Sequence, residues 1–324
     1  MDINNKAIRK NTAFIATVYN EADTIRPFLE SLAGQSVLPA EIVIVDGGST
    51  DGTVKIIKSC FRDFSLPVRV NIIQEEAGIS RGRNIAIKAA RSEVICVSDA
   101  GCILDRDWLG TLASNAGPDT VAGGYSAALA NSFLERCLAS AVVVLPHQVK
   151  EDRFMPSSRN VCFYKSAWER VGGYPQNLDF GEDMKFNFFL KNQGYRIKFV
   201  PRAVVRWLMR TSLSSIFKQF FRYAKGDALG RMYTYRHGLR IGSAAVFLAF
   251  LTLIFTVSWW FLLPLALLLL VYSRPAFFRV GYVFEGRRCC KKAAAIMLLP
   301  FLLAYIDLAK LCGYFYGLAI RRRI

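Results

Sequence analysis

Residues 41–53 read Glu-Ile-Val-Ile-Val-Asp-Gly-Gly-Ser-Thr-Asp-Gly-Thr, an apolar β-branched run that ends in an acid and a glycine-rich turn. A second apolar run, Val94–Ser98, ends in the same way with Asp99, Ala100 and Gly101. Such runs are typical of buried parallel strands, and parallel strands end at one edge of a sheet. The sequence therefore predicts that the Asp46 and Asp99 carboxylates share the edge where open α/β sheets bind ligands.

Strands and helices alternate outward from these two runs. Ser49 or Thr50 is predicted to cap the second helix, and Gly194 to end the fourth. This alternation indicates right-handed crossovers and a mostly parallel sheet flanked by helices, which is the α/β class. Further strands are predicted at Ala13–Val18, Arg69–Ile73 and Arg196–Val200, and helices at Ala22–Ala33, Asp51–Phe61, Ile79–Ala90 and Glu182–Asn192.

The positive charge of the chain is concentrated in its later part. Residues 1–201 carry 23 Lys and Arg against 22 Asp and Glu, whereas residues 202–324 carry 19 against 3, a net charge of +16. Because the apolar segments lie in the same part, we expect this charge to face anionic lipid head groups on the cytoplasmic side of an inner or plasma membrane. Nucleic-acid binding is not predicted, since no recognition motif accompanies the charge.

Long apolar segments predict membrane helices. Ile241–Tyr272 is a run of 32 residues without a charge, well above the roughly 20 residues that one span needs. Trp259, Trp260 and Pro264 favour two helices joined by a turn, with one tilted helix as the alternative. A third apolar segment contains Asp307 and Lys310, which are expected to pair, and it either spans the membrane or lies at its surface.

The expected organisation has three parts. The polar residues 1–10 hold no apolar signal core, so we expect the first part to remain in the cytoplasm. The parts are an α/β domain at 1–210, a basic amphipathic interfacial helix at 211–240, and a membrane region at 241–324 with a helical hairpin at 241–272, a basic loop at 273–292 and the third apolar segment at 293–319.

Cysteine and histidine predict neither a disulfide framework nor a zinc site. The chain has 8 Cys and 2 His without a Cys-x-x-Cys pair, a pattern that is typical of proteins in a reducing cytosol. We assign no role to His147.

Polar side chains after the predicted strands form the candidate site. Asp46 and Gly48 follow the second strand, where a carboxylate accepts hydrogen bonds from a base or from ribose hydroxyls. Arg81, Arg83 and Asn84 begin a helix, and guanidinium groups at a helix N-terminus suit phosphate. The end of the first strand is predicted to line a base pocket with Thr17, Tyr19, Asn20 and Glu21.

Glu182 and Asp183 lie in the first turn of another predicted helix, where the helix dipole favours negative charge. A base to deprotonate a hydroxyl, a pocket for a nucleotide and cations for a diphosphate are the parts that sugar transfer with inversion needs. Together these residues predict a nucleotide-sugar site.

The order of these motifs resembles that of inverting family 2 glycosyltransferases with the nucleotide-diphospho-sugar transferase (GT-A) fold, over residues 12–236. The motifs are Thr-Val-Tyr-Asn-Glu at 17–21, Asp-Gly-Gly-Ser-Thr-Asp-Gly-Thr at 46–53, Gly-x-x-x-Gly-Arg-Asn at 78–84, Asp-Ala-Gly at 99–101 and Gly-Glu-Asp at 181–183. The resemblance implies a hexosyltransferase-like enzyme that uses a nucleoside-diphosphate sugar, expected to be a UDP-sugar. It implies that Asp183 is the general base and that Glu182 orients it.

The chain departs from this family at its metal motif. The family has Asp-x-Asp where this chain has Asp99-Ala100-Gly101, and the second acid binds Mg²⁺ or Mn²⁺ there. Asp99 is the one acid left to touch ribose or a metal, and Arg206 or Arg210 is expected to neutralise the diphosphate instead. We therefore expect weaker or altered dependence on Mg²⁺ or Mn²⁺.

A second resemblance concerns the acceptor. Gln219, Arg222 and Tyr223 are similar to the Gln-x-x-Arg-Trp motif of membrane-bound processive synthases, with Tyr in place of Trp. These residues and Trp207 are candidates for contacting the acceptor or the diphosphate. The expected function is transfer of a sugar to a lipid-linked or glycan acceptor in the synthesis of cell-surface polysaccharide or glycolipid. The alternatives are transfer to polyprenyl phosphate and a non-catalytic membrane scaffold with a degenerate metal site.

Overall fold

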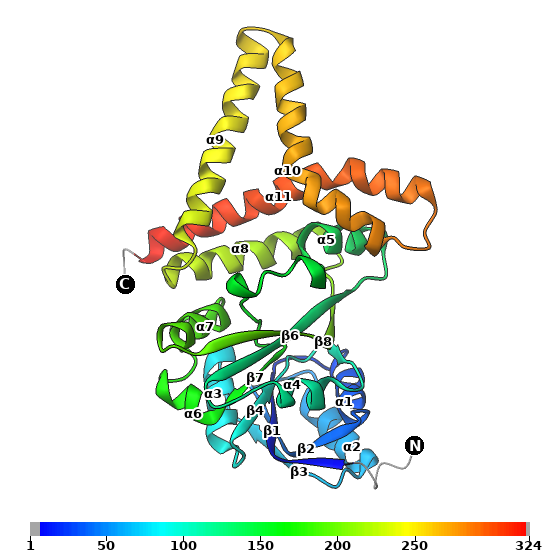
Figure 1. Ribbon diagram of the computed structural model, residues 1–324, viewed down its shortest axis with the longest axis vertical. Helices are drawn as coiled ribbons and strands as arrows, with labels where there is room; N and C mark the ends of the chain where they lie inside the picture. Colours follow the sequence, from blue (N-terminus) through cyan, green and yellow to red (C-terminus); the bar gives the residue numbers. More distant parts are fainter. Residues whose placement is uncertain (1–6, 322–324) are drawn as a thin grey trace. The chain divides into compact units, whose positions relative to one another are not determined.

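The structure is a computed structural model in which residues 7–321 are described (Figure 1). The chain divides into two compact units. The first unit contains the residues up to Leu129 together with Pro146–Leu208, and the second contains Ala130–Leu145 and the residues from Met209 onward. This division differs from the expected organisation because residues 130–145 belong with the later helices.

One mixed sheet organises the first unit, and its strand order among the described residues is β3-β2-β1-β4-β7-β6-β8-β5. The first half is parallel, with β1 (Ala7–Val18), β2 (Val37–Asp46), β3 (Arg69–Gln74) and β4 (Val94–Val97). Helices α1 (Ile25–Ala33), α2 (Thr53–Phe64) and α3 (Ile79–Ala89) connect these strands. The predicted βα alternation is therefore present, and Val18 and Asp46 are register partners at the carboxyl ends of β1 and β2.

The second half of the sheet is mixed in direction. β7 is antiparallel to β4 and to β6, β8 is parallel to β6, and β5 is antiparallel to β8. The elements of this half are β5 (Cys102–Leu104), α4 (Trp108–Ser114), β6 (Thr120–Leu129), β7 (Val161–Tyr164), α6 (Lys165–Arg170), α7 (Glu182–Asn192) and β8 (Arg196–Leu208), with short 3₁₀ turns η2 (Pro146–Gln148) and η3 (Glu151–Arg153).

Alternating side chains of the strands build one core on each face of the sheet. Phe14 packs on one face with α1, α2 and α4, while its neighbour Ile15 packs on the other with α3, α6 and α7. The Phe14 ring lies 5.9 Å from the Phe28 ring and 6.0 Å from the Trp108 ring, measured between centroids. Full burial of one such side chain contributes about 1.5–3 kcal/mol, so these layers fix the strand ends that carry the candidate site.

One local prediction, the cap of α2, differs from the structure. Gly52, with φ of +91°, is the N-cap of α2, and neither Ser49 nor Thr50 caps the helix. The Ser49 hydroxyl instead accepts a hydrogen bond from the backbone N–H of Asn20 at 2.8 Å. The capping prediction was wrong because this hydroxyl is used to join the β1–α1 loop to the β2–α2 loop.

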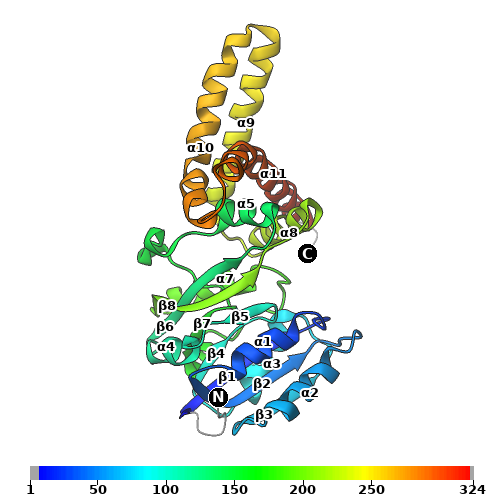
Figure 2. The same cartoon turned by 90° about the vertical axis from the view of Figure 1, so that its right-hand side faces the viewer.

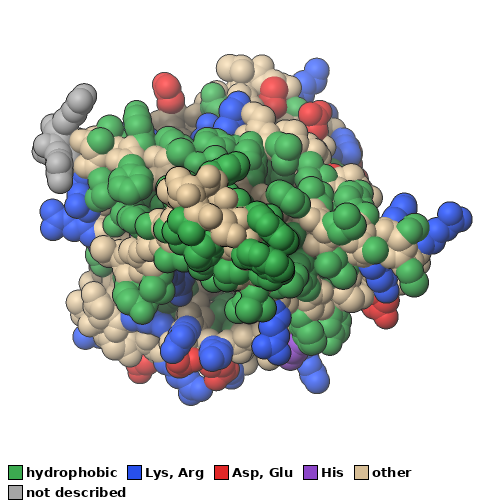
Figure 3. Space-filling model, turned by 90° about the horizontal axis from the view of Figure 1, so that it is seen from above, with side chains coloured by type: hydrophobic (Ala, Val, Ile, Leu, Met, Phe, Trp, Pro, Cys, Tyr) green, Lys and Arg blue, Asp and Glu red, His purple; other side chains and the backbone are tan. Residues whose placement is uncertain are grey.

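The second unit is helical. α9 and the first part of α10 lie side by side in Figures 1 and 2, and Figure 3, seen from above, shows hydrophobic side chains gathered over this hairpin. The turn around Trp259 and Trp260 is where the sequence predicts it, but α10 continues beyond Tyr272, so the predicted basic loop at 273–292 is wrong over most of its length. The elements are α5 (Phe133–Val142), α8 (Leu213–Leu229), α9 (Thr234–Thr256), η4 (Trp259–Phe261), α10 (Leu262–Val283) and α11 (Cys289–Arg321).

Three of these helices are long and apolar enough to cross a membrane: Thr234–Thr256, Trp259–Val283 and Cys289–Arg321. Their large side chains face outward, with Phe255 85% exposed and Leu267 63% exposed. An exposed apolar surface of this extent fits lipid better than water. The second unit therefore associates with a membrane.

Close packing of α8 against α11 holds the second unit together. A Cβ added at Gly313 of α11 would lie 2.1 Å from the backbone oxygen of Phe221 in α8, and one added at Gly317 would lie 2.8 Å from that of Lys225. These two small residues, one helical turn apart, let the helix backbones touch. Asp307 of α11 also accepts a hydrogen bond from Arg240 Nε at 2.8 Å, and Lys310 Nζ lies 3.9 Å from the same carboxylate.

Candidate active site

The end of β2 presents a buried carboxylate within a tight loop. Asp46 is 1% exposed and accepts hydrogen bonds from the backbone N–H groups of Gly48 at 3.3 Å and Ser49 at 3.2 Å. Gly47 has to be glycine here, because a Cβ would lie 2.7 Å from the backbone oxygen of Ala77. The loop that follows β2 therefore curls over Asp46 and holds its carboxylate in place.

The β1–α1 loop is tied to the loop after β2. Asn20 Oδ1 accepts from the backbone N–H of Thr50 at 2.9 Å, and Thr53 Oγ1 accepts from that of Glu21 at 2.8 Å. Tyr19 is 60% exposed beside these contacts. Thr17, by contrast, packs against α3, since a Cβ at Gly82 would lie 2.9 Å from Thr17 Cγ2. The pocket role of these side chains stays a prediction.

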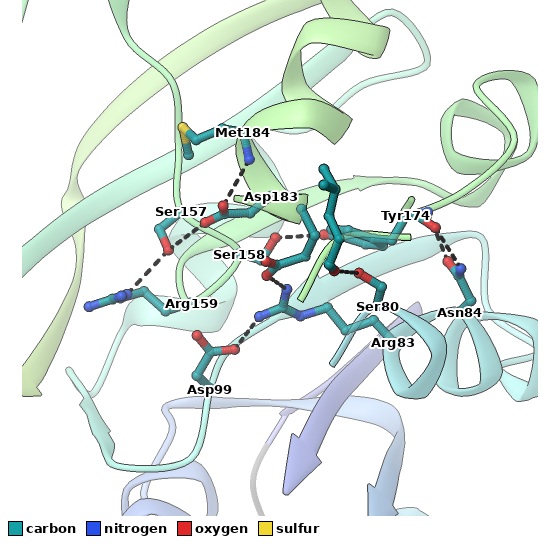
Figure 4. Close-up of polar contacts among 12 residues, drawn as sticks. Ser80, Arg83, Asn84, Asp99, Ser157, Ser158, Arg159, Tyr174, Asp183 and Met184 are labelled. Atoms are coloured by element: carbon teal, nitrogen blue, oxygen red, sulfur yellow. Dashed lines mark hydrogen bonds and ion pairs between the residues drawn. The ribbon is translucent and has the colours of Figure 1, made fainter. Parts of the chain in front are cut away.

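A buried arginine joins three elements of the site (Figure 4). Arg83 of α3 is 1% exposed. Its Nη2 donates to Asp99 Oδ1 and its Nη1 donates to Glu182 Oε1, each at 2.6 Å. Both Nη groups of Arg83 are engaged by carboxylates, while its buried Nε–H has no hydrogen-bond partner among the described residues. The predicted contact of Arg83 with phosphate stays a prediction. The structure thus places Arg83 as a clamp between the end of β4 and the start of α7.

Burial and charge set the protonation of this cluster. Burial raises the pKa of Glu182 to about 7, the Arg83 charge opposes that rise, and the Asp183 charge adds to it. Burial alone would lower the pKa of Arg83, but the charges of Asp99 and Glu182 exceed that effect and raise it well above its usual value. Arg83 therefore stays charged at every pH at which the fold persists.

Asn84, the next residue, fastens the segment that precedes α7. Its Oδ1 accepts hydrogen bonds from Trp168 Nε1 and from the backbone N–H of Tyr174, and its Nδ2 donates to the Tyr174 backbone oxygen, all at 2.9 Å. Tyr174 in turn hydrogen-bonds Ser158 through its hydroxyl at 2.8 Å. These contacts use the amide of Asn84 inside the protein, while its predicted contact with the donor stays untested.

Asp183 is half-buried in the first turn of α7, and two groups hold its carboxylate. Ser157 Oγ donates to Asp183 Oδ2 at 3.1 Å, and the backbone N–H of Met184 donates to Oδ1 at 2.8 Å. Arg159 Nε donates to the same Ser157 hydroxyl at 3.2 Å, and Arg159 Cζ lies 4.4 Å from the centroid of the Trp207 ring. The segment Ser157–Asn160 before β7 is therefore part of the site. Sequence reasoning missed it, because a short polar run ahead of a strand is also typical of an ordinary loop.

The carboxylates near the end of β4 bear on the metal prediction. No group of three or more His, Cys, Asp or Glu side chains suited to a metal occurs within residues 7–321. Asp99 is engaged by Arg83, and at Gly101 a Cβ would lie 3.9 Å from Glu21 Oε2. Mg²⁺ is commonly held by one or two carboxylates together with waters and substrate phosphates, so Asp99 is the acid of this motif that could contribute and the altered metal dependence stays a prediction.

The other predicted cations lie elsewhere. Arg81 forms an exposed ion pair with Glu75 at 2.6 Å, and Arg206 pairs with Asp105 across β8 and β5. Arg210, Gln219, Arg222 and Tyr223 belong to the second unit, where Gln219 Nε2 donates to the Tyr223 hydroxyl at 2.9 Å. Within the first unit Arg83 joins Asp99 to Glu182, and Asp183 follows Glu182 in the chain. Asp46 ends β2, which lies two strands from β4 in the sheet. The roles of these residues and the acceptor roles of the second-unit residues stay predictions.

Two family models match the chain: glycosyl transferase family 2 over residues 13–144 and glycosyl transferase family group 2 over residues 118–306. Similar curated proteins are poly-β-1,6-N-acetyl-D-glucosamine synthases of Staphylococcus aureus strain MSSA476, 27% identical over 223 residues, and of Staphylococcus epidermidis, 24% identical over 224 residues. These alignments cover 66% of this chain and 53% and 54% of the relatives, so the chain spans about half of their length.

Among solved structures, a mannosyltransferase from Pyrobaculum calidifontis in complex with GDP-Man and Mn²⁺ aligns over 97% of this chain and 87% of its own, with a TM-score of 0.54 and 17% identity. This likeness and the mixed sheet confirm the predicted GT-A fold. The second family model alone covers more than half of the chain. The chain therefore belongs to glycosyl transferase family group 2, as the order of its motifs predicts.

Proposed function

We propose that the protein transfers a sugar from a nucleoside-diphosphate donor, a UDP-sugar, to a lipid-linked or glycan acceptor with inversion at the anomeric carbon. The observation that carries this proposal is the Asp183 carboxylate, held by Ser157 and the Met184 N–H in the unit that also contains Asp46 and Asp99. Two fixed hydrogen bonds orient a carboxylate without removing its remaining lone pairs, which is what a general base requires.

The residues divide the reaction between them. The nucleotide occupies the carboxyl edge near Asp46, whose buried carboxylate accepts hydrogen bonds from the base or ribose. Asp183 accepts the proton of the acceptor hydroxyl as that oxygen attacks the anomeric carbon. Glu182, bound to Arg83 at 2.6 Å, fixes the start of α7 and so the direction of Asp183. Catalysis then depends on a base whose direction is fixed before substrates bind.

Membrane association fits acceptors that remain at a membrane. The helices α9, α10 and α11 supply the apolar surface, and residues 202–324 carry the net charge of +16 that favours a cytoplasmic orientation and contact with anionic lipid. The similarity to poly-β-1,6-N-acetyl-D-glucosamine synthases supports a glycan acceptor in cell-surface polysaccharide synthesis. We therefore propose that the first unit works on the cytoplasmic face.

Asp183→Asn in the detergent-purified full chain tests the proposed function. With UDP-N-acetylglucosamine and a short N-acetylglucosamine oligosaccharide as probes, we expect transfer to fall about 10²- to 10⁴-fold because the base is lost. UDP binding measured by calorimetry should stay unchanged, since Asp183 does not hold the nucleotide. Asp179→Asn, an exposed acid four residues earlier, serves as the control and should keep full activity.

Each contrary result has a distinct meaning. Full transfer to the oligosaccharide by Asp183→Asn would contradict the assignment of Asp183 as the base. If Asp183→Asn still transfers the sugar to polyprenyl phosphate, that lipid is the favoured acceptor, because its phosphate is already ionised and needs no base. A wild-type chain that binds no nucleotide, with or without Mn²⁺, would overturn the enzyme assignment in favour of a scaffold.

A further inference from the structure

Arg159 lies beside the segment in which the family's metal ligand is replaced. Cys102, directly after Gly101, is the register partner of Trp207 in the antiparallel pair of β5 and β8. Directly opposed residues of such a pair project to the same face of a sheet. Because the Arg159 guanidinium stacks on the Trp207 ring, with Cζ 4.4 Å from the centroid, the cation stands next to the Asp99-Ala100-Gly101 turn.

Electrostatics support the same placement. Burial raises the pKa of the Cys102 thiol to about 12, the Arg159 charge lowers it, and the Asp99 charge raises it. The charges of Arg159 and Asp99 therefore both act on the residue that follows Gly101, which agrees with the placement of Arg159 beside this turn.

Arg159 is also connected to the base. Its Nε donates to Ser157 Oγ at 3.2 Å, and Ser157 donates onward to Asp183 Oδ2 at 3.1 Å. Figure 4 shows the three side chains in sequence, with Asp99 on the other side of Arg159. One hydroxyl thus sets the distance between a cation and the carboxylate that would activate the acceptor.

We propose that Arg159 binds the diphosphate of the donor and neutralises the leaving group, in the place where this family otherwise uses a carboxylate-bound metal ion. The proposal rests on the proposed function. The acceptor oxygen forms a bond to the anomeric carbon and its proton passes to Asp183. The bond from that carbon to the diphosphate oxygen breaks, the electron pair stays on the oxygen, and Arg159 offsets the added negative charge.

The chemistry of the side chain suits this task. A guanidinium is charged at every relevant pH and matches two phosphate oxygens at once, and stacking on an indole fixes its plane. The Ser157 hydroxyl and the Trp207 ring orient the Arg159 guanidinium through the contacts described above.

Calorimetry with UDP and with uridine, both in EDTA, tests the proposal on the full chain. The wild type should bind UDP without a divalent cation. Arg159→Gln should weaken UDP binding about 10- to 100-fold, as the loss of a charged hydrogen bond does, and should leave uridine binding unchanged because uridine has no diphosphate. Arg153→Gln is the matched control, since Arg153 is 74% exposed and pairs with Asp152.

Two results overturn the proposal: UDP binding by Arg159→Gln equal to the wild type, or wild-type UDP binding that requires Mn²⁺. If the wild type binds neither UDP nor uridine under any condition, the proposed function and this proposal are both overturned. If uridine binds but Arg159→Gln does not weaken UDP binding, this proposal alone is overturned. If Arg159→Gln does not fold, Arg159→Lys decides. Lysine keeps the positive charge but lacks the planar guanidinium with its paired N–H donors. Weaker UDP binding with normal uridine binding by this variant supports the proposal, and unchanged UDP binding contradicts it.

Discussion

Arg83 is a buried cation of the candidate site, and it compensates the charges of two acids. With Arg83 and Glu182 both buried, removal of the arginine leaves an unpaired charge in a place that water barely reaches. Such a loss costs about 3–5 kcal/mol. The carboxyl group most affected is Glu182, whose pKa of about 7 already lies above its usual value.

We expect Arg83→Met to destabilise the protein, and more strongly at pH 8 than at pH 5. A carboxyl group whose pKa is higher in the folded state binds its proton more tightly there, so its contribution to stability is complete at low pH and is lost as the pH rises through about 7. Thermal unfolding of the detergent-purified chain at the two pH values measures this. Arg83→Met combined with Glu182→Gln is the control and should remove the pH dependence. An equal loss at both pH values would contradict the prediction.

At individual positions the sequence identifies what local signals determine. Asp46 follows a strand end and Asp183 begins a helix, and local sequence determines both features. The ion pair of Arg206 with Asp105 could not be predicted, because Asp105 is about a hundred residues away and follows β5, which pairs with β8. Arg159 was missed for the same reason, since its neighbour Trp207 comes from a distant strand.

Among the elements, the contact between α8 and α11 depends most on residue size. Gly313→Ala would place a methyl group 2.1 Å from the Phe221 backbone oxygen, which a rigid helix pair cannot accommodate without separating. We expect a loss of about 1–3 kcal/mol from overpacking, even though alanine favours helix. The melting temperature of the variant in detergent measures this loss of stability. A decrease in melting temperature no larger than that of the control described next would contradict the close packing of α8 against α11.

Gly281→Ala is the control for that change. Gly281 lies in α10, and a Cβ there meets no atom within 4 Å. Alanine at this position should leave stability equal or raise it by about 0.5–1 kcal/mol, because it lowers the entropy lost by the helix.

Element boundaries were predictable where local signals set them. The bounds of α7, Glu182–Asn192, agree with the sequence, which shows an acidic first turn and a following glycine. β8 runs on from the predicted Val200 to Leu208, because it pairs with β6 and then also with β5. α10 continues past Tyr272 and through Arg274, the charge at which the predicted uncharged run ended, because α5 packs beside it and accepts a hydrogen bond from Arg279. Tertiary contacts of this kind cannot be seen in a single stretch of sequence.

For the molecule as a whole, the distribution of charge predicts its orientation. The η4 turn between α9 and α10 carries no charged residue, whereas Arg287, Arg288, Lys291 and Lys292 lie at the other end of α10 and the start of α11. The positive-inside rule then places the η4 turn on the outer face of the membrane.

Ser258→Cys tests this orientation in intact cells. A membrane-impermeant thiol reagent should label the variant above the wild-type level, because residue 258 precedes the η4 turn, whereas the predicted orientation puts the exposed Cys289 and Cys290 on the cytoplasmic side. Two results would contradict the predicted orientation. In one, the reagent labels the wild type as strongly as the variant in intact cells; in the other, it labels neither protein until the cells are permeabilised.

The left-handed backbone conformation of Gly101 limits which residues can replace it. Its φ of +81° belongs to the left-handed region, where an ordinary side chain costs about 1 kcal/mol or more. Restoring an aspartate there would therefore meet conformational strain, and the new carboxylate would stand beside Arg159, the cation we assign to the diphosphate. A second acid at position 101 would therefore require the backbone of the turn and the neighbouring arginine to change with it, so no single substitution supplies a metal-binding carboxylate here without a cost in stability.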